Sequence, residues 1–219
     1  MQIASYIDHT ILKPTCLITD VERVCKEAVE YGFAAVCIPP PFVKRAKTIL
    51  SPTRVKVATV IGFPFGYAPI ESKVAETVLT LVDGADELDM VINLIALKNG
   101  DWEYLEKEIG LVKDIIRQKG KVIKVIIESG VLTNEEIARC CSLYAKAGVD
   151  FLKTSTGYAE KGATIEAVQL MRKHLPSTIS IKASGGIKTY EFAKLLIEAG
   201  ASRLGSSASV EIVKYKDTP

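Results

Sequence analysis

One stretch of the chain, GVDFLKTSTG from Gly148 to Gly157, shows the unit that the rest of the sequence repeats. Its first glycine is suited to end a helix, and the apolar run that follows is typical of a strand buried in a parallel sheet. The run ends in Lys153. Apolar surroundings disfavour the ammonium form of a lysine, and the neutral amine attacks carbonyl groups. Most lysines lie on the surface, so the stretch alone predicts a buried strand and leaves the role of Lys153 open.

Short apolar runs alternate with longer amphipathic segments along the whole chain, which is the pattern of a parallel sheet covered by helices. The predicted strands are the run that ends at Lys153 and residues 7–12, 34–38, 55–61, 87–93, 122–127, 178–183 and 203–205. The predicted helices are residues 20–32, 42–50, 69–82, 101–119, 133–148, 164–174 and 189–199, with a last one opened by Ser206 and Ser207. This alternation predicts an α/β fold, a single-domain (β/α)8 TIM barrel over residues 1–219. An open doubly wound sheet is the alternative, but neither of its usual nucleotide-binding glycine motifs occurs in the sequence.

The composition narrows the class of protein. The 28 lysine and arginine residues nearly balance 26 aspartate and glutamate residues, so no nucleic-acid partner is expected. The five cysteines include no Cys-x-x-Cys pair, which argues against a disulfide framework and against a cysteine zinc site. The first residues lack a signal-peptide pattern, and no apolar run approaches the roughly 18 residues of a membrane span. We therefore expect a cytoplasmic protein without a membrane partner.

The active site of a parallel barrel lies at the carboxyl ends of its strands, so charged residues of the strands are the candidates for chemistry. They are Asp8, Asp89, Lys124, Glu128, Lys153 and Lys182. If Lys153 and Lys182 lie on adjacent strands at similar height, their ammonium groups are roughly 5 to 7 Å apart. Their repulsion is about 2.8 kcal/mol at an effective dielectric near 20, which lowers a lysine pKa from about 10.4 to about 8. In the alternative interpretation, both lysines form buried ion pairs with Asp89 or Glu128 and only hold the barrel together.

Glycine-rich loops follow the last two predicted strands. Gly185-Gly186 comes after one strand, and Gly205-Ser206-Ser207 comes after the next, before a helix. Barrels bind phosphate at such places through backbone N–H groups, although plain turns also use glycine. Two such loops in succession favour a phosphate site.

Other chemistries find fewer candidate residues. The only histidines are His9 and His174, and no His-Glu-x-x-His motif occurs, so we expect no metal. His9 is expected to be a hydrogen-bonded structural residue. Ser155, Ser184 and Ser206 have no evident histidine partner, and Cys37 is compatible with a small core residue.

Six segments, taken together and in order, resemble the deoxyribose-phosphate aldolase family of class I aldolases. They are Ile7-Asp8-His9-Thr10, Val36-Cys37-Ile38, Glu87 to Asn93, Lys124 to Glu128, Phe151 to Gly157 and Lys182 to Ile187. The Lys-Thr-Ser-Thr-Gly and Lys-Ala-Ser-Gly-Gly-Ile segments are the most specific, and the resemblance covers nearly the whole chain.

The resemblance implies a (β/α)8 barrel without metal or organic cofactor that reversibly cleaves 2-deoxy-D-ribose 5-phosphate to D-glyceraldehyde 3-phosphate and acetaldehyde. It implies that Lys153 forms the Schiff base, that Lys182 lowers the pKa of Lys153 and takes part in proton transfer, and that Asp89 is the acid/base carboxylate. We expect small-molecule phosphosugar and aldehyde substrates, and a homo-oligomer whose size the sequence does not give. The expected substrate-binding residues are Asp8, Thr10, Cys37, Lys124, Thr154, Gly157, Gly185, Gly186, Gly205, Ser206 and Ser207.

Three positions depart from the family pattern. Pro39 replaces a residue that is polar in many members, and Tyr158 stands where some members have a lysine that helps to hold phosphate. The tail does not end in the tyrosine that some members place over the site, so Tyr215 is assigned no role. The rival hypotheses are a non-catalytic phosphosugar-binding barrel and a phosphosugar isomerase, neither of which would form an adduct on Lys153.

Overall fold

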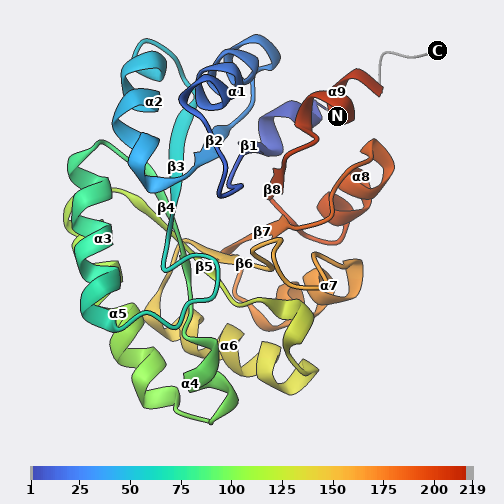
Figure 1. Cartoon of the computed structure of the whole chain (residues 1–219). Coiled ribbons are helices and arrows are strands. Elements are labelled where there is room, and N and C mark those ends of the chain that lie inside the picture. The colour runs from blue at the N-terminus through green and yellow to red at the C-terminus, as the bar shows by residue number, and fades with distance from the viewer. Residues whose placement is uncertain (1, 216–219) are drawn as a thin grey trace.

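The computed structural model describes residues 2–215, in which eight parallel strands close into a barrel surrounded by helices (Figure 1). The strands pair in chain order, and the last pairs with the first. The single-domain (β/α)8 barrel is thus confirmed, and the open sheet is excluded. The strands are β1 (Ile7–Thr10), β2 (Ala35–Ile38), β3 (Lys56–Ile61), β4 (Glu87–Val91), β5 (Val122–Ile126), β6 (Phe151–Lys153), β7 (Ser180–Ser184) and β8 (Arg203–Ser206).

Each predicted helix is present, with ends shifted by a few residues. The long helices are α1 (Ile18–Tyr31), α2 (Val43–Leu50), α3 (Ile70–Val82), α5 (Trp102–Gln118), α6 (Asn134–Ala147), α7 (Ile165–His174), α8 (Tyr190–Glu198) and α9 (Ser209–Lys214). Shorter helices that the sequence did not predict are η1 (Ile3–Tyr6), η2 (Pro40–Phe42), α4 (Leu94–Lys98) and η3 (Ser129–Val131). Residues 2–215 include no helix long and apolar enough to cross a membrane.

The stretch around Lys153 folds as its sequence predicts. Thr133 caps α6, and Gly148 ends it in the left-handed conformation at φ 69° that glycine adopts without strain. The carboxylate of Asp150 then accepts a hydrogen bond of 2.9 Å from the backbone of Ile123, which ties the start of β6 to β5. These contacts fix the height at which Lys153 ends the strand.

Alternate strand residues face opposite sides of the barrel wall. Leu88 and Met90 of β4, for example, face outward and join the main core beneath the helices. Ala35, Cys37, Ala58 and Val60 of β2 and β3 form a separate, smaller apolar cluster. Charged side chains from the other strands occupy the rest of the interior, which is therefore apolar on one side and ionic on the other.

Candidate active site

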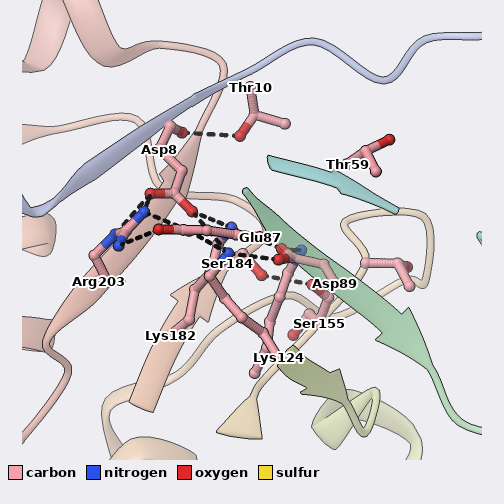
Figure 2. Close-up of polar contacts among 12 residues, drawn as sticks. Asp8, Thr10, Thr59, Glu87, Asp89, Lys124, Ser155, Lys182, Ser184 and Arg203 are labelled. Carbon is pink, nitrogen blue, oxygen red and sulfur yellow. Dashed lines mark hydrogen bonds and ion pairs between the residues drawn. The ribbon is translucent and has the colours of Figure 1, made fainter. Parts of the chain in front are cut away.

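Seven charged side chains from six strands meet inside the barrel (Figure 2, where all but Lys153 are labelled). We call this set the charged cluster. The strands supply residues of opposite charge at neighbouring register positions, such as Asp89 beside Lys124. The members are Asp8, Glu87, Asp89, Lys124, Lys153, Lys182 and Arg203.

Asp89 is the carboxylate that joins three lysines. Its Oδ1 lies 2.7 Å from the ammonium nitrogen of Lys124, and its Oδ2 lies 2.8 Å from that of Lys153 and 2.7 Å from that of Lys182. Burial raises the pKa of Asp89, but the three lysines outweigh burial and hold the pKa well below its usual value. Asp89 is therefore an ionised hydrogen-bond acceptor.

Asp8 organises the opposite side of the cluster. One of its oxygens contacts the ammonium group of Lys182, and the other accepts a hydrogen bond of 2.7 Å from Nε of Arg203. Burial raises the pKa of Asp8, but the cations, mainly Lys182 and Arg203, lower it by more, so the pKa lies below its usual value. Burial alone would lower the pKa of Lys182, but Asp8 and Asp89 raise it above its usual value. Lys182 is thus held in its ammonium form.

Lys153 differs from Lys182 in the direction of its pKa shift. Burial lowers the pKa of the Lys153 ammonium below its ordinary value; Asp89 opposes this effect, and Lys182 adds to it. The cluster contains four cationic groups and three carboxylates. One neutral amine balances these charges, and Lys153 is the cation of the cluster whose surroundings favour that form.

A cavity of about 490 Å³ opens above Lys153 at the carboxyl ends of β1, β6, β7 and β8. Lys153 is only 3% exposed, yet its side chain reaches the cavity floor. The described lining residues include the cations Lys13, Arg23 and Lys188 and no carboxylate. This charge pattern suits an anionic ligand.

The structure brings many predicted binding residues to the cavity wall and leaves others away from it. Among the residues on the wall, Gly185 and Gly186 have left-handed φ values of 90° and 77°, which favour glycine. Gly205 leaves room for the cluster, because a Cβ there would lie 2.9 Å from Ser184 Cβ and 3.2 Å from Lys182 Cε. The predicted residues that line the cavity are Thr10, Lys153, Gly157, Gly185, Gly186, Gly205, Ser206 and Ser207.

Asp8, Asp89, Lys124 and Lys182 lie within the charged cluster and not on the described cavity wall. Two further predicted residues lie elsewhere. The hydroxyl of Thr154 bridges β6 and β7 through hydrogen bonds of 3.2 and 3.0 Å with the backbone of Ser184. Cys37 belongs to the apolar cluster of β2 and β3. A direct contact of Thr154 or Cys37 with substrate stays a prediction.

Tyr158 connects three loops at the mouth of the cavity. Its hydroxyl donates a hydrogen bond of 2.8 Å to the backbone oxygen of Leu12, and its ring packs edge-on against Phe63 at 5.3 Å. Pro39 lies before η2 and does not line the described cavity. Glu128, which was expected with the cluster, instead bonds to Thr156 beyond β6.

Several residues of the site were not predicted from the sequence. Glu87 lies two positions before Asp89, so the two-residue period of a strand could have placed it on the same inward face. Arg203 is likewise two positions before Gly205. Lys13, Arg23 and Lys188 gave no local signal, because a lysine or arginine in a loop or helix resembles any surface residue.

His9 has the structural contact that the sequence suggested. Its Nε2 lies 2.7 Å from a carboxylate oxygen of Glu27 on α1. Within residues 2–215, no group of three or more histidine, cysteine, aspartate or glutamate side chains is arranged to hold a metal ion.

The sequence matches the model of a family described as DeoC/LacD family aldolase over residues 2–212. The class of protein is therefore an aldolase, an enzyme that belongs to the lyases. A deoxyribose-phosphate aldolase of Thermococcus gammatolerans is 53% identical over 98% of this chain and 96% of its own length. One of Caldanaerobacter subterraneus is 51% identical over 98% and 93%.

Solved structures agree with these relatives. A deoxyribose phosphate aldolase of Aeropyrum pernix, described as having a unique tetrameric structure, superimposes with a TM-score of 0.92 at 32% identity. The alignment covers 99% of this chain and 91% of the other. The chain thus belongs to the deoxyribose-phosphate aldolases of the DeoC/LacD family. Membership in a lyase family removes the non-catalytic barrel and the isomerase as alternatives.

Proposed function

We propose that the protein is a class I aldolase that reversibly cleaves 2-deoxy-D-ribose 5-phosphate to D-glyceraldehyde 3-phosphate and acetaldehyde, in deoxyribose phosphate catabolism. The observation that carries the proposal is the place of Lys153. Among the residues described, it is the one member of the charged cluster that also lines the cavity. The names of the relatives supply the substrate, and the cationic cavity with its glycine loops suits the phosphate.

The proposed reaction begins at the amine of Lys153. In its neutral form the amine attacks the aldehyde carbon of the open-chain substrate and gives a carbinolamine, which loses water to give an iminium. Asp89, 2.8 Å from the amine, is placed to accept the proton that the attacking nitrogen loses. Lys182 keeps a positive charge beside this step and favours the neutral form of Lys153.

The iminium then accepts the electron pair of the carbon–carbon bond. The hydroxyl on the third substrate carbon loses its proton, the bond to the second carbon breaks, and glyceraldehyde 3-phosphate leaves. The remaining enamine is protonated on carbon, and water releases acetaldehyde and Lys153. Asp89, Lys182 and an ordered water are the proposed carriers of these protons, while Lys124 and Asp8 orient the network.

Trapping with borohydride tests the proposal. Reduction in the presence of acetaldehyde should convert the iminium into a stable secondary amine, and peptide mapping should place the added mass on Lys153. Lys153→Leu should neither form the adduct nor release acetaldehyde. An unlabelled Lys153 peptide from enzyme that is turning over would exclude the mechanism.

We infer further that the enzyme needs no metal or organic cofactor, because the iminium itself serves as the electron sink. A chelator should leave the activity intact, whereas loss of activity that zinc restores would contradict this mechanism.

We also propose a cytoplasmic homo-oligomer. The tetramer described for the Aeropyrum pernix relative supports assembly, and the five free cysteines suit a reducing compartment. Light scattering on the purified protein tests the assembly.

A further inference from the structure

The turn after β5 contains a strained residue that the proposed reaction does not use. Glu128 has φ 54°, and among residues 2–215 it is the one residue other than glycine with a positive φ. A side chain with a Cβ disfavours this conformation, so the surrounding structure must hold it there. The side chain is 3% exposed and does not line the described cavity. Its carboxylate therefore bonds to residues of the protein and not to a ligand in the cavity.

The carboxylate of Glu128 binds the loop between β6 and α7. The backbone N–H of Thr156 donates to its two oxygens at 3.2 and 3.3 Å, and the hydroxyl of Thr156 donates to one of them. That hydroxyl oxygen accepts a hydrogen bond of 3.0 Å from the backbone of Tyr158. A chain of hydrogen bonds thus runs from Glu128 to the residues that face the cavity.

Backbone contacts hold the same two segments together nearer the strands. The N–H of Ile127 donates to the oxygen of Lys153 at 3.1 Å, and that of Ser129 donates to Thr154 at 2.7 Å. These bonds do not depend on the side chain at position 128. The side chain adds hydrogen bonds to Thr156, beyond Thr154, next to Gly157 and Tyr158.

The far side of this loop packs against the glycine loop after β7. Gly162 lies against the backbone of Gly185, since a Cβ on Gly162 would be 2.3 Å from the Gly185 oxygen. Gly157 is also close to Gly185. The loop that Glu128 holds therefore forms one cavity wall with the proposed phosphate loops. The amine of Lys153 is instead bonded to Asp89, and its attraction to Glu128 is the smallest of the effects that act on the pKa of Glu128.

We propose that Glu128 is a positioning residue for the phosphate end of the substrate, whose carboxylate holds Thr156 so that Gly157 and Tyr158 stay at the cavity wall. The inference rests on the proposed function, because it takes the anion to be the phosphate of that substrate. It predicts that Glu128 affects phosphate recognition more than the chemistry at Lys153.

Two variants distinguish the effect of the Glu128 carboxylate from the effect of the backbone conformation at this position. Glu128→Gly removes the carboxylate and tolerates the positive φ, and Glu128→Gln keeps an oxygen that accepts from the N–H of Thr156. With 2-deoxyribose 5-phosphate, Glu128→Gly should raise KM about tenfold and change kcat less than about twofold, a loss of uniform binding. Glu128→Gln should recover most of the loss. With unphosphorylated 2-deoxyribose, both variants should match the unmodified enzyme within about twofold.

A binding measurement makes the result independent of turnover. Calorimetric titration with inorganic phosphate should show a weaker Kd for Glu128→Gly and a nearly unchanged one for Glu128→Gln. Equal losses on both sugars, or an unchanged KM and phosphate Kd in folded Glu128→Gly, would overturn the inference. If Glu128→Gly does not fold, an unchanged KM and phosphate Kd in Glu128→Ala, confirmed as folded by circular dichroism, overturns it. Failure of the unmodified enzyme to cleave 2-deoxyribose 5-phosphate would instead contradict the proposed function, and the titration would still test Glu128.

Discussion

Lys153 and Lys182 are neighbours in register on β6 and β7, yet their environments shift their pKa values in opposite directions. Both ammonium nitrogens contact Asp89 Oδ2, so they lie no farther apart than the sum of two hydrogen-bond lengths. Asp8 supplies Lys182 with a second carboxylate and gives Lys153 no such contact. The opposite pKa shifts of the two lysines therefore depend largely on one additional carboxylate.

Replacing Lys182 with methionine should move the pH profile of the enzyme toward alkaline pH. Lys153 must be neutral to attack, so kcat/KM should rise as the pH increases through its pKa, which burial places below 10.5. Removing Lys182 deletes a charge that lowers this pKa and leaves Asp89 freer to stabilise the ammonium form. We expect the rising limb to shift upward and kcat/KM at pH 7 to fall about 100-fold or more.

The matched control is Lys146→Met. Lys146 is a surface lysine whose side chain is 80% exposed, and it pairs only with Glu106 in the described ion pairs. Its profile should coincide with that of the unmodified enzyme. A Lys182→Met profile with an unshifted rising limb would show that Lys182 does not set the pKa of Lys153.

At the scale of elements, the loops after β6 and β7 depend on close backbone approach. Gly162→Ala would place a Cβ 2.3 Å from the backbone oxygen of Gly185, and backbone cannot move aside as a flexible side chain does. We expect this variant to lose about 1–3 kcal/mol of unfolding free energy and to raise KM for the phosphorylated substrate. Urea denaturation and steady-state kinetics measure the two effects.

Gly110→Ala is the control for this change. Gly110 lies within α5 and has open space around its Cβ position, so alanine should stabilise the helix by roughly 0.5–1 kcal/mol. If Gly162→Ala proves as harmless as Gly110→Ala, the two loops are not in the contact described.

A second ionic feature lies between helices, outside the cavity. Lys73 of α3 and Glu108 of α5 are fully buried, 2.6 Å apart, and Lys73 also donates to the backbone oxygen of Val91 at 2.7 Å. Burial lowers the pKa of Lys73 and raises that of Glu108, in each case more than their mutual attraction opposes it. The pair thus anchors the end of β4, two residues after Asp89, at a high desolvation cost.

Single and double variants of Lys73 and Glu108 should distinguish the desolvation cost of the buried pair from the attraction between its two members. Lys73→Met or Glu108→Leu alone should destabilise the protein by about 3–5 kcal/mol, because each leaves a buried polar group without its partner. The double variant should recover most of the loss, as measured by urea unfolding. Additive losses in the double variant would mean that the ion pair is not the source of the effect.

At the scale of the whole molecule, the charged cluster joins six of the eight strands, so its ionisation should affect global stability. The folded pKa of Asp89 lies below the value of about 3.9 expected in the unfolded chain. Its stabilisation is therefore fully present above about pH 4 and is lost as the pH falls toward its folded pKa. Glu76, Glu108 and Glu128 have raised pKa values and contribute the opposite slope at higher pH.

The contribution of Asp89 can be isolated with Asp89→Asn. Urea unfolding between pH 3 and pH 7 should show that the unmodified protein loses stability below about pH 4 more steeply than Asp89→Asn does. Parallel curves for the two proteins would show that Asp89 does not have a depressed pKa in the folded state.

The fold could be predicted from the sequence because the signals that mark helices and strands are local. Glycine caps such as Gly148 and two-residue periods such as that of Asp89 depend on neighbouring residues. Lys153 and Lys182 could be found because each lies in a short apolar run. Of the two causes of a lowered pKa that the sequence suggested for Lys153, burial and repulsion by a neighbouring cation, burial is the larger. The cavity cations and the bridging role of Thr154 could not be predicted, because they depend on where loops from distant strands meet.

The closure of the barrel by β1 and β8 bears on how the enzyme is made. Asp8 is synthesised before its partner Arg203, which is 195 residues farther along the chain. Until that last strand is released and paired, Asp8 lacks this partner and the ionic surroundings of Lys153 are incomplete. The ionic surroundings of Lys153 are therefore complete only after β8 has paired with β1, so a polypeptide that lacks β8 should not present the same amine to aldehydes.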